Sequence, residues 1–281
     1  MLERQAYDGE RTSGRKPWSL CGPLAFARFW LENAIVEYDV TQDERALFDD
    51  VSSLAGDLWA KSLEITGRFK DPKIISAMLF KRLWSNHRGY ALLWNNRLQL
   101  ESDIVLRSAI EASICLAANA VLKDEFAVLL HRDAAQTILG QIKLHRANED
   151  LETVRDAEAV LRDLKEHLAE DAKPVGLNWQ SLSEQGGVPH LYAWYRMLSG
   201  TSSHVTGASI LTSVTDASGP CNVAELLSMQ RKLHFVMMAG ATLRGSMRHA
   251  GVLDDEPAAR CALDLTNRLS DLSYYLPGVG G

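Results

Sequence analysis

LWNNRLQLESDIVLRSAIEASICLAANA, residues 93–120, is the stretch that decides the fold, because it predicts the central helix of an all-helical protein. Its last part, residues 103–120, contains neither glycine nor proline and is rich in alanine, leucine and isoleucine, which favour or tolerate helix. Apolar residues recur along it at the spacing of a helix. They are Ile104, Leu106, Ile110, Ile114, Ala117 and Ala118.

Two charged residues interrupt this apolar segment. Arg107 and Glu111 are four positions apart, so their side chains lie on one face of the predicted helix. Buried charge is costly unless it is paired, and arginine before glutamate is the weaker order for a surface pair. The pair is therefore either a structural ion pair that fixes helix packing or part of a polar site built into a helical bundle.

Further helices are expected on both sides of the central one. Thr41 with Glu44 three positions later has the pattern of a capping box, and Asp71-Pro72 has the pattern of a capped helix start. The predicted helices span residues 23–38, 42–66, 71–94, 124–147, 151–169, 188–198, 204–211, 223–249 and 257–275. No strand pattern and no internal repeat is found, and the loops are short. We therefore expect about eight to ten helices in a single all-α domain, residues 21–281, after a flexible N-terminal arm, residues 1–20.

Composition limits the protein class. The 281 residues are 46% hydrophobic and 23% charged, and the net charge of −6 disfavours a general nucleic-acid coater. The four cysteines form no CxxC pair, which is typical of buried, reduced thiols. The charged start resembles no signal peptide, and residues 197–215, although uncharged, are too rich in Ser, Thr and Gly to cross a bilayer. These features predict a cytoplasmic protein that does not enter a membrane.

A second stretch, YAWYRMLSGTSSHVT at residues 192–206, carries most of the remaining chemistry. Residues 199–203 (SGTSS) predict a helix break and a cap, and free backbone N–H groups there suit an anion or a phosphate. His204 would begin the next helix, where the helix dipole keeps an imidazole neutral and able to act as a general base. A nearby arginine could stabilise a pentavalent phosphate. In the structural alternative, Ser199 and Thr201 cap helices, and His204 bonds to Glu111.

Several well-known motifs are missing from the sequence. It contains no GxxxxGK[ST] phosphate loop, no GxGxxG, no HExxH, no Glu-x-x-His pair and no GxSxG. We therefore expect neither a cofactor nor a metal ion.

The two stretches together resemble an all-helical bacterial family of unknown function whose members are cytoplasmic. The resemblance rests on Arg107-x-x-x-Glu111 in the first stretch, and on Tyr192-x-x-Tyr195-x-x-x-Ser199-x-x-x-x-His204 in the second. It covers about residues 50–250, and the two motifs in this order are more specific than either alone. The serine stands one residue further from the histidine than in that family, so Ser202 and Ser203 are alternatives for its role.

That family is distantly similar to the HEPN helical bundles, many of which are metal-independent ribonucleases of toxin–antitoxin and phage-defence systems. The resemblance implies that His204 activates a ribose 2′-hydroxyl, that Arg107 or Arg196 holds the scissile phosphate, and that Glu111 orients His204. Tyr195, Arg196, Ser199 and Ser202 would contact an RNA or nucleotide substrate. Here seven residues separate Arg196 from His204, more than the four to six of the HEPN motif.

Three functional hypotheses follow. A HEPN-like ribonuclease predicts that Arg107, Glu111 and His204 converge on an open groove in a symmetric homodimer. A non-catalytic helical scaffold or regulatory partner protein predicts that the same residues are buried and satisfy one another. A small-molecule-binding bundle predicts an apolar cavity near Met237 and Met238.

Overall fold

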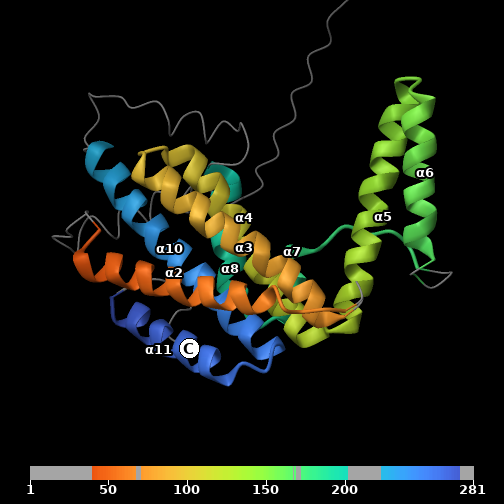
Figure 1. The fold of residues 1–281 in the computed structure, drawn as a ribbon. Coiled ribbons are helices and arrows are strands. Elements are labelled where there is room, and N and C mark those ends of the chain that lie inside the picture. The colour runs from red at the N-terminus through yellow and green to blue at the C-terminus, as the bar shows by residue number, and fades with distance from the viewer. Residues whose placement is uncertain (1–39, 68–70, 167, 169–171, 202–222, 273–281) are drawn as a thin grey trace, which may run out of the picture. The chain divides into compact units, whose positions relative to one another are not determined.

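The computed structural model describes residues 40–67, 71–166, 168, 172–201 and 223–272. These ranges contain nine helices and no strand, which confirms the all-α prediction (Figure 1). The helices are α2 (Gln42–Ser62), α3 (Pro72–Asn95), α4 (Gln99–Leu122), α5 (Asp124–Ala147), α6 (Leu151–Lys165), α7 (Trp179–Gln185), α8 (Pro189–Thr201), α10 (Val223–Val252) and α11 (Glu256–Leu272). The helices predicted at residues 23–38 and 204–211 lie outside the described residues, as does the predicted domain boundary at residue 20, which stays a prediction.

Local sequence signals set several helix boundaries. Thr41 and Glu44 form the expected capping box, in which each side chain accepts a hydrogen bond from the other residue's backbone N–H. Asp71 caps α3 through the backbone N–H of Lys73, and Pro72 occupies the first turn. Both caps satisfy N–H groups that a helix start otherwise leaves without a partner.

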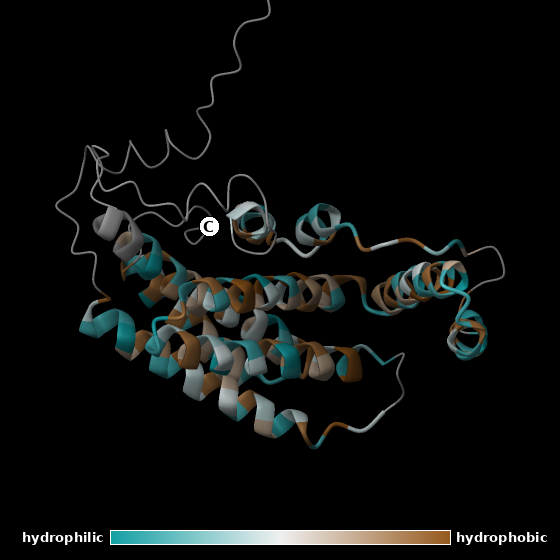
Figure 2. Ribbon diagram, turned by 90° about the horizontal axis from the view of Figure 1, so that it is seen from above, coloured by the Kyte–Doolittle hydropathy of each residue, from teal (hydrophilic) through white to brown (hydrophobic). Residues whose placement is uncertain are grey.

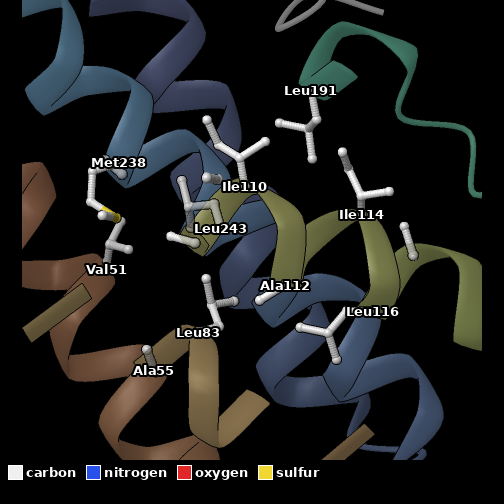
Figure 3. Packing of buried hydrophobic residues seen from close by; sticks show 14 of the residues in the cluster. Val51, Ala55, Leu83, Ile110, Ala112, Ile114, Leu116, Leu191, Met238 and Leu243 are labelled. Carbon is white, nitrogen blue, oxygen red and sulfur yellow. The ribbon is translucent and has the colours of Figure 1, made fainter. Parts of the chain in front are cut away.

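The central helix α4 packs against α3 and α10, and also against α5, α7 and α8. All eight residues from 112 to 119 are buried, which is more than two helical turns, so every side of α4 is covered there. Figure 3 shows Ile110, Ile114 and Leu116 in one cluster with side chains from α2, α3, α8 and α10. In Figure 2, hydrophobic segments gather where helices face one another and hydrophilic segments lie outward.

Within the described residues, α4 is the one helix long and apolar enough to cross a membrane. However, 61% of its most apolar window is buried inside the structure, as in the core helix of a folded domain. Of the cysteines, Cys115 on α4 is buried, as predicted, whereas Cys261 on α11 is exposed. The prediction of a buried thiol is therefore wrong for Cys261.

Glycine permits a close approach between α4 and the turn that joins α7 to α8. A Cβ atom added to Gly186 would lie 2.8 Å from the Cβ of Ala117, and 3.0 Å from the backbone C of Ala117 and the backbone N of Ala118. Backbone atoms cannot move aside as a side chain does. Gly186 therefore sets the distance at which α7 and α8 pack on α4.

The helices α5 and α6 form a hairpin with a small core of its own. Its buried members are Ala135, Ile142, Val154 and Leu161. The first turn of α5 belongs instead to the main core, because Phe126 and Ala127 are buried there. The sequence predicts α6 to be a peripheral arm with one apolar stripe, and Val154 and Leu161 of that stripe are buried whereas Val160 is 47% exposed.

Two buried histidines join α2, α3 and α10. The Nε2 atom of His87 lies 2.7 Å from Ser52 Oγ, and its Nδ1 atom lies 2.9 Å from Thr242 Oγ1. His249 repeats the arrangement, 2.7 Å from Ser62 Oγ and 2.8 Å from Ser76 Oγ.

The hydrogen bonds of the serines assign the histidine tautomers. The α2 serines donate their hydroxyl protons to the carbonyls of Phe48 and Leu58, so each must accept from histidine Nε2–H. The Nε2 atom of each imidazole is therefore a hydrogen-bond donor. Burial lowers the pKa of both, from 6.5 to about 4.

These histidines predict a loss of stability in mild acid. The unfolded chain binds protons as the pH falls through about 6.5, whereas the folded chain does so only near pH 4, so the free energy of unfolding falls across that interval. We expect a loss on the order of 3 kcal/mol per histidine. Urea unfolding at pH 7, 5.5 and 4.5 measures it, and His87→Gln and His249→Gln should each flatten the pH dependence.

His190 is partly buried, and burial and the charge of Arg244 lower its pKa to about 4. Both variants therefore keep part of the pH dependence of the free energy of unfolding. An unaltered slope in His87→Gln and His249→Gln would show that burial does not lower the pKa of either imidazole.

A second prediction concerns Gly186. Gly186→Ala should destabilise the protein by about 1–3 kcal/mol, because the added methyl group overlaps the backbone of α4. Gly140→Ala in α5 is the control, since its Cβ would meet no atom within 4 Å, and it should stabilise by about 0.5–1 kcal/mol through helix propensity. Urea unfolding of both variants tests the difference, and equal stabilities would refute the close approach.

Candidate functional site

Arg107 is the centre of a polar cluster between α4 and α8. Its Nη2 atom lies 3.0 Å from Glu111 Oε1 and 3.3 Å from the Tyr195 hydroxyl, and its Nε–H donates to Ser199 Oγ at 3.0 Å. The guanidinium carbon also lies 4.9 Å from the centre of the Tyr195 ring, in cation–π range. We call Arg107, Glu111, Tyr195 and Ser199 the Arg107 cluster.

Helix periodicity brings these four residues together. Arg107 and Glu111 are one turn apart on α4, and Tyr195 and Ser199 are one turn apart on α8. The buried residues Leu191, Trp194 and Leu198 pack α8 into the main core. Tyr195 and Ser199 each follow one of these buried residues, so they lie beside the buried face and meet Arg107.

The helix break predicted at residues 199–203 is wrong at its beginning, because α8 continues to Thr201. Ser199 Oγ donates to the carbonyl of Tyr195 at 2.7 Å, and Thr201 Oγ1 donates to the carbonyl of Met197 at 3.0 Å. These hydroxyls bond within the helix instead of capping a new one. Ser199 Oγ, with its own proton so used, accepts from Arg107.

Burial makes the cluster an ion pair within a largely desolvated site. The side chains of Arg107 and Glu111 are only 21% and 18% exposed. Burial raises the pKa of Glu111, and the positive charges of Arg107 and Arg82 act against that rise. Glu111 therefore depends on Arg107 for part of the stabilisation of its negative charge.

The structure brings together four of the predicted site residues, those of the Arg107 cluster. Arg196 is exposed on α8 and has no described contact with them. Ser202, Ser203 and His204 lie outside the described residues. The roles predicted for these residues in binding or cleaving RNA therefore stay predictions.

A second buried polar pair was not predicted. His234 Nδ1 on α10 lies 2.6 Å from Asp103 Oδ1 on α4, and both side chains are under 5% exposed. Gln99 donates to the same carboxylate oxygen at 2.8 Å. The signal for this pair in the sequence is an aspartate beside the most apolar part of α4, because a buried carboxylate needs a partner.

No metal site is found in the described part of the chain. Among those residues, no three His, Cys, Asp or Glu side chains gather in a way that could hold a metal ion. Met237 and Met238 are fully buried in the main core. The pocket described on α10 lies further along the helix, at Met247.

The cluster as it stands suits packing better than catalysis. The charge of Arg107 is neutralised by Glu111, and its donors reach two hydroxyl groups of the same chain. A phosphate that binds Nη2 of this arginine displaces Glu111. No described residue of the cluster is a histidine, so it holds no group that titrates near neutral pH by its ordinary pKa.

Comparison with known proteins found no family model, no curated protein and no solved structure that matches this chain. The cluster is therefore interpreted from its own geometry.

The Arg107 cluster predicts an asymmetry between single and double substitutions. Arg107→Met should destabilise the protein by about 2 kcal/mol, because it leaves the largely buried Glu111 carboxylate without its cation. The double variant Arg107→Met/Glu111→Leu should be more stable than the single one, since no charge then stays buried. Thermal and urea unfolding of both proteins measure the difference.

The exposed pair Arg260–Glu256 on α11 provides the control. It has the same four-residue separation, and its side chains are 70% and 81% exposed. Arg260→Met should change stability by less than about 0.5 kcal/mol, because water already solvates both charges. Equal losses in Arg107→Met and Arg260→Met would mean that the Arg107 cluster contributes no more than a surface pair.

Proposed function

We propose that the protein is a non-catalytic helical scaffold or regulatory partner protein, in which the Arg107 cluster locks α8 to α4. One observation carries this proposal: the guanidinium group of Arg107 is shared among Glu111, Tyr195 and Ser199 of its own chain. A structural lock requires side chains that bond to one another, whereas a substrate site requires hydrogen-bonding groups that are free to bind a ligand.

The charge of the chain also supports the lock. The net charge of −6 opposes tight binding of a polyanion such as RNA. This agrees with a protein that acts through its folded shape.

The α5–α6 hairpin supports a role in binding a partner protein. Its four-residue core is separate from the main core. Leu139, Leu144 and Leu151 on the hairpin are 37%, 60% and 59% exposed. An element with its own core can change its contacts while α4 stays packed.

The HEPN-like ribonuclease is the competing proposal, and it depends on His204. It also includes the homodimer and the RNA or nucleotide substrate that the family resemblance implies. It requires His204 to lie close to Arg107 and Glu111, and it requires Glu111 to break its ion pair with Arg107.

An RNA-cleavage experiment separates the two proposals. Purified wild type, His204→Ala and Glu111→Gln are incubated with a mixed RNA pool in EDTA, and products are resolved on a sequencing gel. The scaffold proposal expects no cleavage above the buffer background by any of the three, and a lower unfolding temperature for Glu111→Gln.

Cleavage by the wild type that disappears in an equally stable His204→Ala protein would overturn the scaffold proposal. Identical purification of the variants controls for contaminating nucleases. Sedimentation equilibrium of the same samples tests the homodimer.

A further inference from the structure

A pocket of about 580 Å³ lies where α3 begins, α4 ends and α10 ends. Its walls include Pro72, Lys73, Asn119, Lys123 and Met247. Asn119 is twelve residues beyond Arg107 on α4, a separation of roughly 18 Å along a helix axis. The pocket is therefore distinct from the Arg107 cluster, and nothing in the lock proposal uses it.

Asn119 contributes to this pocket a hydrogen-bond acceptor that has no donor. Its side chain has no exposed surface, and its Nδ2 donates to the carbonyl of Pro72 at 2.9 Å. A carbonyl only accepts hydrogen bonds, so this contact fixes the orientation of the amide. The Oδ1 atom is then left buried without a hydrogen-bond partner, which is costly unless a ligand supplies a donor.

The charged groups of the pocket leave a net charge of +1. Lys73, Lys123 and Arg248 are cations, and Asp71 and Asp254 are carboxylates, so three charges stand against two. Lys73 pairs with Asp254 at 3.0 Å, whereas Lys123 is exposed and has no ion pair among the described residues. Arg248 donates to the carbonyl of Gly186 at 3.0 Å, so Lys123 is the pocket cation whose side chain has no described partner and is available to a ligand's negative group.

The remaining wall offers apolar contact and space. Pro72, Ala120, Met247 and Val252 are apolar, and a Cβ atom added to Gly251 would meet no atom within 4 Å. Ligand pockets typically combine such apolar walls with a few polar groups that fix orientation.

We propose that this pocket binds a small organic monocarboxylate that has an apolar body and an O–H or N–H donor. The carboxylate pairs with Lys123, the apolar body lies against Met247, and the donor bonds to Asn119 Oδ1. Asn119 has no exposed surface, so its Oδ1 atom accepts a hydrogen bond from the ligand only after the side chains around it move.

Three small probes separate the contributions of the two polar groups. 4-Hydroxyphenylacetate has both a carboxylate and a hydroxyl group, phenylacetate lacks the hydroxyl, and 4-hydroxyphenylethanol lacks the carboxylate. Each is titrated into the ¹⁵N-labelled full chain, with the side-chain amide of Asn119 as the reporter. We expect 4-hydroxyphenylacetate to bind most tightly and to shift the Asn119 resonances.

Lys123→Gln tests the carboxylate contact. It should weaken binding of 4-hydroxyphenylacetate about 3- to 5-fold, as for a partly exposed ion pair, and leave binding of 4-hydroxyphenylethanol unchanged. Lys165→Gln, an exposed lysine at the end of α6, is the control and should change neither. The proposal is overturned if the three probes bind equally, if none shifts Asn119, or if Lys123→Gln binds as the wild type does.

Discussion

The burial of α4 on every side at residues 112–119 is the constraint on which the rest of the structure depends. A helix that is buried on every side needs neighbours on every side, and α3, α7, α8 and α10 provide them. The close packing requires small residues at the contacts. Gly186 meets Ala117, and Gly245 of α10 lies where a Cβ atom would be 3.0 Å from Ser113 Oγ. The alanines and serines of α4 therefore allow its neighbours to approach its backbone.

Polar groups in this core define how the helices align. Apolar contacts are not directional, so they alone permit helices to slide or rotate. The bonds of His87 and His249, and the bond from Ser113 Oγ to the carbonyl of Ala241 at 2.7 Å, each require one register. The Arg107 cluster does the same for α8. We interpret these groups as the source of a single packing arrangement.

Sequence reasoning predicted the helices well because their signals are local. The capping box at Thr41 and the Asp71-Pro72 start were confirmed, and α5 begins and ends at the predicted residues 124 and 147. The end of α8 was mispredicted, because Ser199 bonds within the helix instead of breaking it. The partners of the buried histidines were not predicted, since they depend on which helix faces meet. The two motifs of the family resemblance, in contrast, placed Arg107 and Glu111 in one site with Tyr195 and Ser199, which lie together in the structure.

The separation of these partners along the chain bears on the order of folding during synthesis. Ser62 and His249 are 187 residues apart, and His87 and Thr242 are 155 apart. The α3–α4 hairpin has all of its residues within the first half of the chain and can pair early, because contacts between nearby residues form fastest. The hydroxyl group of Ser62 can meet His249 only after α10 has left the ribosome. Until then the face of α4 that α10 covers in the folded protein is exposed, and a chaperone has the longest time to bind it.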